Sequence, residues 1–88
     1  MDAKTVREVE KLATEVPQIL EDVESAAEED AAFEEIEKAK AIAAAFIAKY
    51  DELLKPLGLE DQREVLKRLG VTIAEIERQL THLREAPE

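Results

Sequence analysis

The sequence contains no cysteine, one histidine (His82) and only two glycines among its 88 residues. Without cysteine, the chain can form neither a disulfide framework nor a thiolate site. A single histidine excludes metal sites built from several imidazoles and disfavours catalytic arrangements that need a histidine base. Two isolated glycines cannot form a glycine-rich phosphate-binding loop. We therefore expect a protein that is not an enzyme and that uses no metal or cofactor.

Aromatic residues and long apolar runs are also scarce. The three aromatic residues, Phe33, Phe46 and Tyr50, are too few to form a surface that stacks on nucleic-acid bases. The longest uninterrupted apolar stretch, residues 41–48, is far shorter than the roughly 20 residues that span a bilayer. The first residues are polar and contain no signal-peptide core. These features predict a soluble, cytoplasmic protein with no membrane partner and no evident small-molecule ligand.

Positive charge is limited and is missing from one long stretch. The chain has 22 acidic and 12 basic residues, which gives a formal net charge of −10. Residues 21–37 include nine acidic side chains and no basic one. Such a surface repels phosphate backbones and anionic lipids, so it disfavours direct binding of nucleic acid.

Apolar residues at helical spacing dominate what is present, and they predict helices throughout the chain. A first helix is expected to begin near Ala3. Its apolar positions recur at alternating intervals of three and four residues, the spacing of a heptad seam: Val6, Val9, Ala13, Val16, Leu20, Val23 and Ala27. Leu12 and Ile19 widen this stripe. Pro17 interrupts this series without changing its phase, so one kinked helix is favoured over the alternative of two helices.

A second apolar series follows in another heptad phase: Ala32, Ile36, Ala39, Ala43, Phe46, Tyr50, Leu53 and Leu57. Ser25 and Glu28 match a capping box and predict the start of this helix, although one continuous helix through Ser25 is an alternative. Residues 41–48 have no polar face, so we expect them to be buried on more than one side. Pro56 and Gly58 are expected to end the helix.

Two short helices are predicted after Gly58. Capping boxes that begin at Asp61 and Thr72 mark their starts, and Gly70 between them fits the left-handed end of a Schellman motif. The segment 66–76 is locally similar to the helix-turn-helix of many bacterial regulators. The start of its second helix, however, lacks the basic and amide side chains that read DNA bases. An ordinary helical hairpin is therefore favoured over a DNA-binding regulator.

The expected fold is all-α, a single domain over residues 1–88. It is a small bundle of three to four helices, with two long heptad-patterned N-terminal helices and a short C-terminal αα-hairpin. Residues 1–57 are expected to form a long acidic helical hairpin or one kinked long helix. Residues 58–86 are expected to form the short hairpin, and residues 87–88 a tail.

The first hypothesis for function is a non-enzymatic protein–protein interaction or assembly module of the adaptor, chaperone or scaffold type. Two heptad seams offer more apolar surface than one small monomer can readily cover, so we expect self-association into a homo-oligomer through apolar helix faces. The predicted interface residues are Ile36, Ala39, Ile42, Ala43, Phe46, Ile47, Tyr50 and Leu53.

The alternative hypothesis is an acidic inhibitor that mimics nucleic acid and blocks a basic groove of a nuclease, polymerase or CRISPR effector. Acidic residues four apart on a helix lie about 6 Å from each other, close to the phosphate spacing along one DNA strand. The candidate acidic face consists of Glu21, Glu24, Glu28, Glu29 and Glu35.

Overall fold

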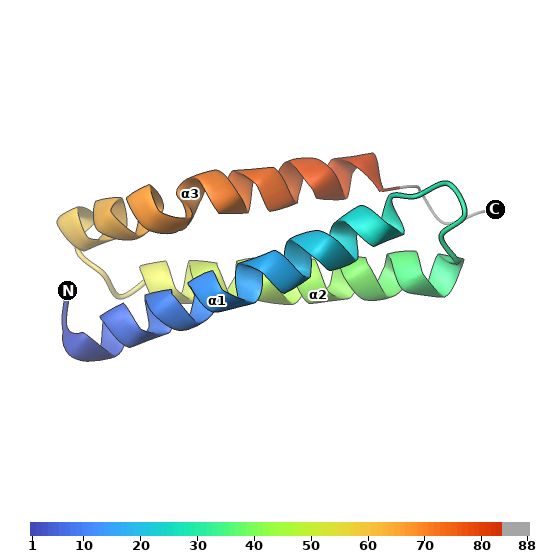
Figure 1. Cartoon of the computed structure of the whole chain (residues 1–88). Helices are drawn as coiled ribbons and strands as arrows, with labels where there is room; N and C mark the ends of the chain where they lie inside the picture. Colours follow the sequence, from blue (N-terminus) through green and yellow to red (C-terminus); the bar gives the residue numbers. More distant parts are fainter. Residues whose placement is uncertain (84–88) are drawn as a thin grey trace.

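The computed structural model, which describes residues 1–83, is a bundle of three long helices. α1 spans Ala3–Ala26, α2 spans Phe33–Leu54 and α3 spans Leu59–His82. The chain runs up, down and up, so that α1 and α3 point the same way and α2 is antiparallel to both (Figure 1). The helices have 24, 22 and 24 residues, and every pair of them is in contact. The all-α bundle is confirmed, with three helices of nearly equal length.

One apolar core runs along the whole bundle between the three helices. Each helix contributes residues at intervals of three or four, which places them on one face. α1 contributes Val9, Leu12, Val16, Ile19, Val23 and Ala26. α2 contributes Ile36, Ala39, Ala43, Phe46, Tyr50 and Leu53, and α3 contributes Val65, Leu69, Ile73 and Ile76. Most of the two long apolar seams is therefore covered within a single chain.

α1 begins where the sequence predicts and continues through Pro17 as one helix. The Asp2 carboxylate accepts a hydrogen bond from the Thr5 N–H at 2.8 Å and caps the helix. This hydrogen bond lowers the pKa of Asp2. Pro17 and Ala13 are both exposed, so the carbonyl that loses its N–H partner lies on the solvent side of the helix.

The buried face of α1 lies toward the side of the predicted stripe that Leu12 and Ile19 widen. Leu12 and Ile19 are buried, whereas Ala13 and Ala27 are exposed and Leu20 is half-buried. Leucine and isoleucine bury more apolar area than alanine, so this rotation of the helix brings the larger side chains into the core.

The helix start predicted at Ser25 is wrong. Ser25 lies in the last turn of α1, and α2 begins only at Phe33, after a connection formed by residues 27–32. Val23 and Ala26 are almost completely buried, so the apolar stripe of α1 continues past Ser25. The free energy gained by burying this stripe exceeds the free energy that a helix cap at Ser25 would contribute.

The predicted short C-terminal hairpin is not formed, because α3 passes through Gly70 and Thr72 as one helix. Gly70 does not adopt the positive φ that a Schellman ending requires. The buried residues on both sides of Gly70 belong to one continuous stripe, which a turn at this point would interrupt. The local resemblance to a helix-turn-helix therefore does not extend to the structure. The predicted tail, residues 87–88, lies outside the described residues.

Gln62 closes the turn between α2 and α3. Its side-chain amide donates hydrogen bonds to the carbonyl oxygens of Leu54, at 3.0 Å, and Leu57, at 3.2 Å. The Leu54 carbonyl also accepts a backbone hydrogen bond from the Leu57 N–H at 3.1 Å, so Gln62 adds a second contact to it and joins the start of α3 to the turn. Pro56 and Gly58 follow the end of α2, as predicted.

Candidate interaction surfaces

The eight predicted interface residues lie mostly inside the bundle. Six of them are buried by the other helices of the same chain, including Phe46 at 2% exposure and Ala43 at 0%. Ile42 and Ile47 are partly buried against the same core. Contact of these side chains with a second chain stays a prediction, and it would require the bundle to open. The closed bundle offers other surfaces to a partner.

The apolar segment at residues 41–48 is buried on one side only. Ala41, Ala44, Ala45 and Ala48 face outward from α2 and are exposed. The expectation that this segment is covered on more than one side is therefore wrong for the single chain. Alanine exposes little apolar area and is the best helix former. Exposure of this face to water therefore lowers the stability of the monomer only slightly.

The candidate acidic residues gather at one end of the bundle without sharing a helix face. Glu21 and Glu24 lie near the end of α1, Glu28 and Glu29 in the connection, and Glu35 in the first turn of α2. All five are exposed. Figure 1 shows these three segments meeting at the end of the bundle that holds the α1–α2 connection. Because α1 ends at residue 26, the regular four-residue spacing of the prediction is interrupted.

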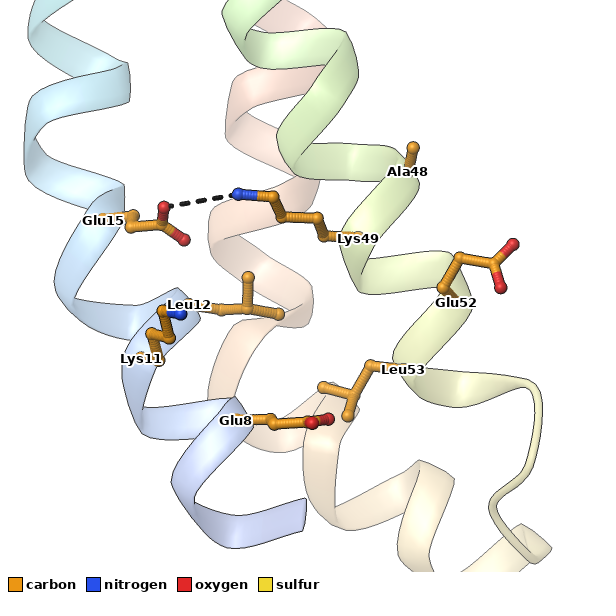
Figure 2. A pocket seen from close by; sticks show the side chains of 8 residues that line it. All are labelled: Glu8, Lys11, Leu12, Glu15, Ala48, Lys49, Glu52 and Leu53. Atoms are coloured by element: carbon orange, nitrogen blue, oxygen red, sulfur yellow. Dashed lines mark ion pairs between the residues drawn. The ribbon is translucent and has the colours of Figure 1, made fainter. Parts of the chain in front are cut away.

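A groove of about 460 Å³ lies between the first half of α1 and the second half of α2 (Figure 2). Leu12 and Leu53 contribute apolar surface to this groove. An ion pair between Lys49 Nζ and Glu15 Oε1, 3.6 Å apart, connects the two helices. The lining side chains include no hydroxyl nucleophile and no imidazole. Within residues 1–83, no group of three acidic, histidine or cysteine side chains is arranged to hold a metal ion.

Tyr50 places a hydroxyl group in the core. The residue is 5% exposed, and its hydroxyl finds no hydrogen-bond partner among the described residues. Burial raises the pKa of Tyr50, and the negative charges of Asp51 and Glu77 raise it further. The flank of α3 that carries Glu77 is turned toward α2, because Gln62 on that side donates to the Leu54 and Leu57 carbonyl oxygens.

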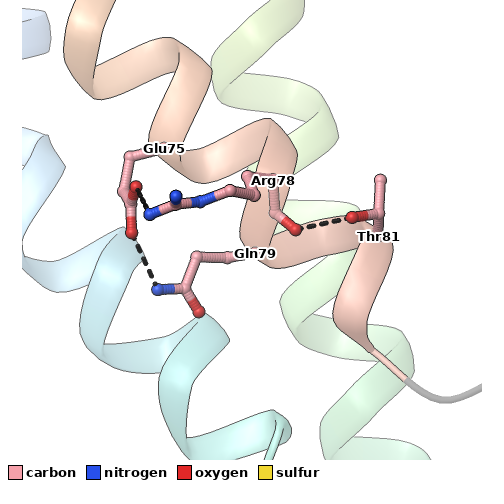
Figure 3. A network of polar contacts seen from close by, with 4 residues as sticks. All are labelled: Glu75, Arg78, Gln79 and Thr81. Atoms are coloured by element: carbon pink, nitrogen blue, oxygen red, sulfur yellow. Dashed lines mark hydrogen bonds and ion pairs between the residues drawn. The ribbon is translucent and has the colours of Figure 1, made fainter.

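The flank of α3 that faces α1 carries paired polar side chains. Glu75 forms an ion pair with Arg78 and accepts a hydrogen bond from the Gln79 amide at 3.1 Å (Figure 3). Nearer the start of α3, Asp61 lies 3.4 Å from the amino group of Met1. Asp61 and Glu75 on that flank therefore have partners within the chain.

The flank of α3 that faces α2 is different. Leu59 and Leu66 are 66% and 49% exposed. Arg63 and Glu77 are also exposed, and neither forms an ion pair with another residue of the described part of the chain. Sequence reasoning missed this surface, because it divided α3 into two helices at Gly70.

None of the helices formed by residues 1–83 is both long and apolar enough to cross a membrane. A comparison of the chain with protein-family models, with curated proteins and with solved structures finds no match. The surfaces of the bundle are therefore the basis for a functional conclusion.

Proposed function

We propose that this chain is a non-enzymatic helical interaction or assembly module that associates with a second copy through exposed apolar helix faces. The observation that carries this proposal is the exposure of large apolar side chains on α3. Leu59, Leu66 and Val71 are 66%, 49% and 82% exposed, although the core is complete without them. Burial of such side chains against another surface contributes about 25 cal/mol per Å² of apolar area.

The spacing of Leu59 and Leu66 favours an interface over random exposure. Leu59 and Leu66 are seven residues apart, so they lie two turns apart on the same side of α3. Isolated apolar residues are common on protein surfaces, whereas two leucines aligned on one side of a helix form a larger continuous apolar area. The exposed alanine face of α2 is a second surface that association can use.

Replacement of both leucines tests this proposal. The double variant Leu59→Gln/Leu66→Gln should stay folded, because both side chains are exposed, and should self-associate at least 10-fold more weakly than the wild type. Sedimentation equilibrium between about 5 and 500 µM measures the association, and circular dichroism measures the helix content. A wild type that sediments at 9.9 kDa throughout this range would contradict the proposal.

The acidic end of the bundle supplies a matched control and a second candidate function. Nine acidic residues gathered at one end favour binding to a basic protein surface over binding to the chain itself. The variant Glu28→Lys/Glu35→Lys should therefore leave self-association intact.

The second candidate function, a mimic of nucleic acid, gains support if the wild type displaces duplex DNA from a basic nuclease and this variant does not.

A further inference from the structure

We propose that two copies of this chain pair through α3, in antiparallel orientation, about a two-fold axis that passes close to Gly70. This inference rests on the proposed function and specifies the surface that performs it. The partner is thus a second copy of the chain, and the same stripe of α3 contacts itself.

The stripe lies beside the buried face of α3 and is not covered by α1 or α2. Its members follow each other at intervals of three or four residues: Leu59, Arg63, Leu66, Gly70, Ala74 and Glu77. All are exposed except Gly70, which is half-buried. Side chains at this spacing form one continuous face along a helix.

The stripe is self-complementary about Gly70. Arg63 lies seven residues before Gly70, and Glu77 lies seven residues after it. Seven residues correspond to about 10.5 Å of helix, so an antiparallel copy centred on Gly70 places each Arg63 beside the partner's Glu77. Leu66 and Ala74, four residues before and after the axis, meet in the same way, with a large side chain against a small one. Each contact occurs twice in the dimer.

Gly70 has no role within the chain that explains its position. A glycine inside a helix is less favourable than alanine. A Cβ atom at Gly70 would meet only the Leu66 side chain, at 3.6 Å, which is an ordinary van der Waals distance. The absence of a side chain does allow a second backbone to approach closely. On the proposed axis, Gly70 is the point where the two helices come nearest.

The charges of the stripe are available for contact between chains. On the flank toward α1, Asp61 and Glu75 already have partners within the chain (Figure 3). Arg63 and Glu77 have no ion pair among residues 1–83. Opposite charges that face each other across a two-fold axis fix the orientation and register of a dimer.

The size of the stripe sets the expected affinity. From Leu59 to Glu77 it spans about 27 Å of helix, which corresponds to an interface at the small end of specific complexes. We therefore expect a weak dimer, with a dissociation constant on the order of 10–100 µM. Such a dimer is measured at concentrations of several hundred micromolar.

Charge reversal at Arg63 and Glu77 tests the pairing. The single variants Arg63→Glu and Glu77→Arg should each weaken dimerisation at least 10-fold, because like charges then face each other twice. The double variant Arg63→Glu/Glu77→Arg should return the dissociation constant to within about 3-fold of the wild-type value. The two positions are about 21 Å apart along α3, so they cannot contact each other within one chain. A rescue therefore requires a second copy.

Two further variants separate the interface from the fold. Gly70→Gln adds a side chain on the axis, so it should weaken dimerisation at least 10-fold while the thermal midpoint of the dilute monomer stays equal or rises. Arg68→Glu, exposed on the other flank of α3, should leave the dissociation constant unchanged. Sedimentation equilibrium at low salt gives each dissociation constant, and circular dichroism verifies that each variant is helical.

The outcomes distinguish this inference from the proposed function. If the charge-reversal single variants dimerise more weakly and the double variant regains the wild-type affinity, the pairing is supported. If the double variant dimerises as weakly as the single variants, the antiparallel register is overturned. A wild type that dimerises while all of these variants dimerise equally well overturns the α3 interface but leaves the proposed function on another face. A wild type that is monomeric at every concentration overturns both.

Discussion

Phe46→Asp is expected to leave the chain without a cooperative unfolding transition. Phe46 is 2% exposed and lies in the core between all three helices. Truncation of a buried aromatic side chain costs about 3–5 kcal/mol, and an unpaired buried carboxylate costs several more. A domain of this size has a total stability of about 4–13 kcal/mol. The substitution therefore removes most or all of that stability, which far-ultraviolet circular dichroism during heating measures directly.

The neighbouring residue supplies the control. Ala45 precedes Phe46 in α2 but faces solvent. Ala45→Asp should keep its helix content and unfold cooperatively, with a stability within about 1 kcal/mol of the wild type. A Phe46→Asp chain that stays helical and cooperative, and that loses only self-association, would show that Phe46 is an interface residue and that the described core is wrong.

Val71→Pro is expected to destabilise the protein by about 3 kcal/mol or more. Val71 is 82% exposed, so the substitution removes almost no packing. The effect comes from the backbone, because proline within α3 loses one hydrogen bond and clashes with the preceding turn. Urea denaturation followed by circular dichroism gives the change in the free energy of unfolding.

The same substitution distinguishes one helix from two. If α3 were a hairpin that turned at Gly70, residue 71 would lie in the turn and would accept proline with little loss. Val71→Ala is the matched control and should stabilise the helix by a few tenths of a kcal/mol, because alanine has the higher helix propensity. A Val71→Pro variant as stable as the wild type would contradict the continuous α3.

Long-range periodicity predicted the parts of the fold that depend on repeated burial. In α2, six of the eight members of the predicted seam are buried, and only its two end members, Ala32 and Leu57, are not. The start of α1 near Ala3 and the end of α2 before Pro56 also agree with the sequence. These features are robust because a stripe of many apolar residues determines which face of a helix is buried.

Short capping patterns were the misleading signals. A side-chain cap contributes about 1 kcal/mol, whereas full burial of an aliphatic side chain contributes about 1.5–3 kcal/mol. Around Thr72, the continuous helix keeps Leu69, Ile73 and Ile76 buried together, which outweighs one cap. The same comparison explains why α1 continues through Ser25 to bury Ala26.

The predicted interface stays a prediction, but one premise behind it changes with the continuous α3. The sequence analysis expected two long heptad seams to offer more apolar surface than one small chain can cover. A continuous α3 of 24 residues removes most of that excess. Large apolar side chains stay exposed on α3 at Leu59, Leu66 and Val71. The full stripe from Leu59 to Glu77 is recognisable only when residues on both sides of Gly70 belong to one helix.

The central claim is that one chain completes its own core and associates only through its outer faces. The dependence of the thermal midpoint on protein concentration tests this claim most directly, because an obligate oligomer loses stability on dilution and a monomeric fold does not. Between about 1 and 10 µM, we expect a cooperative transition whose midpoint changes by less than about 2 °C. A midpoint that falls steadily with dilution, or a chain that is unfolded at 1 µM, would show that the core is shared between chains.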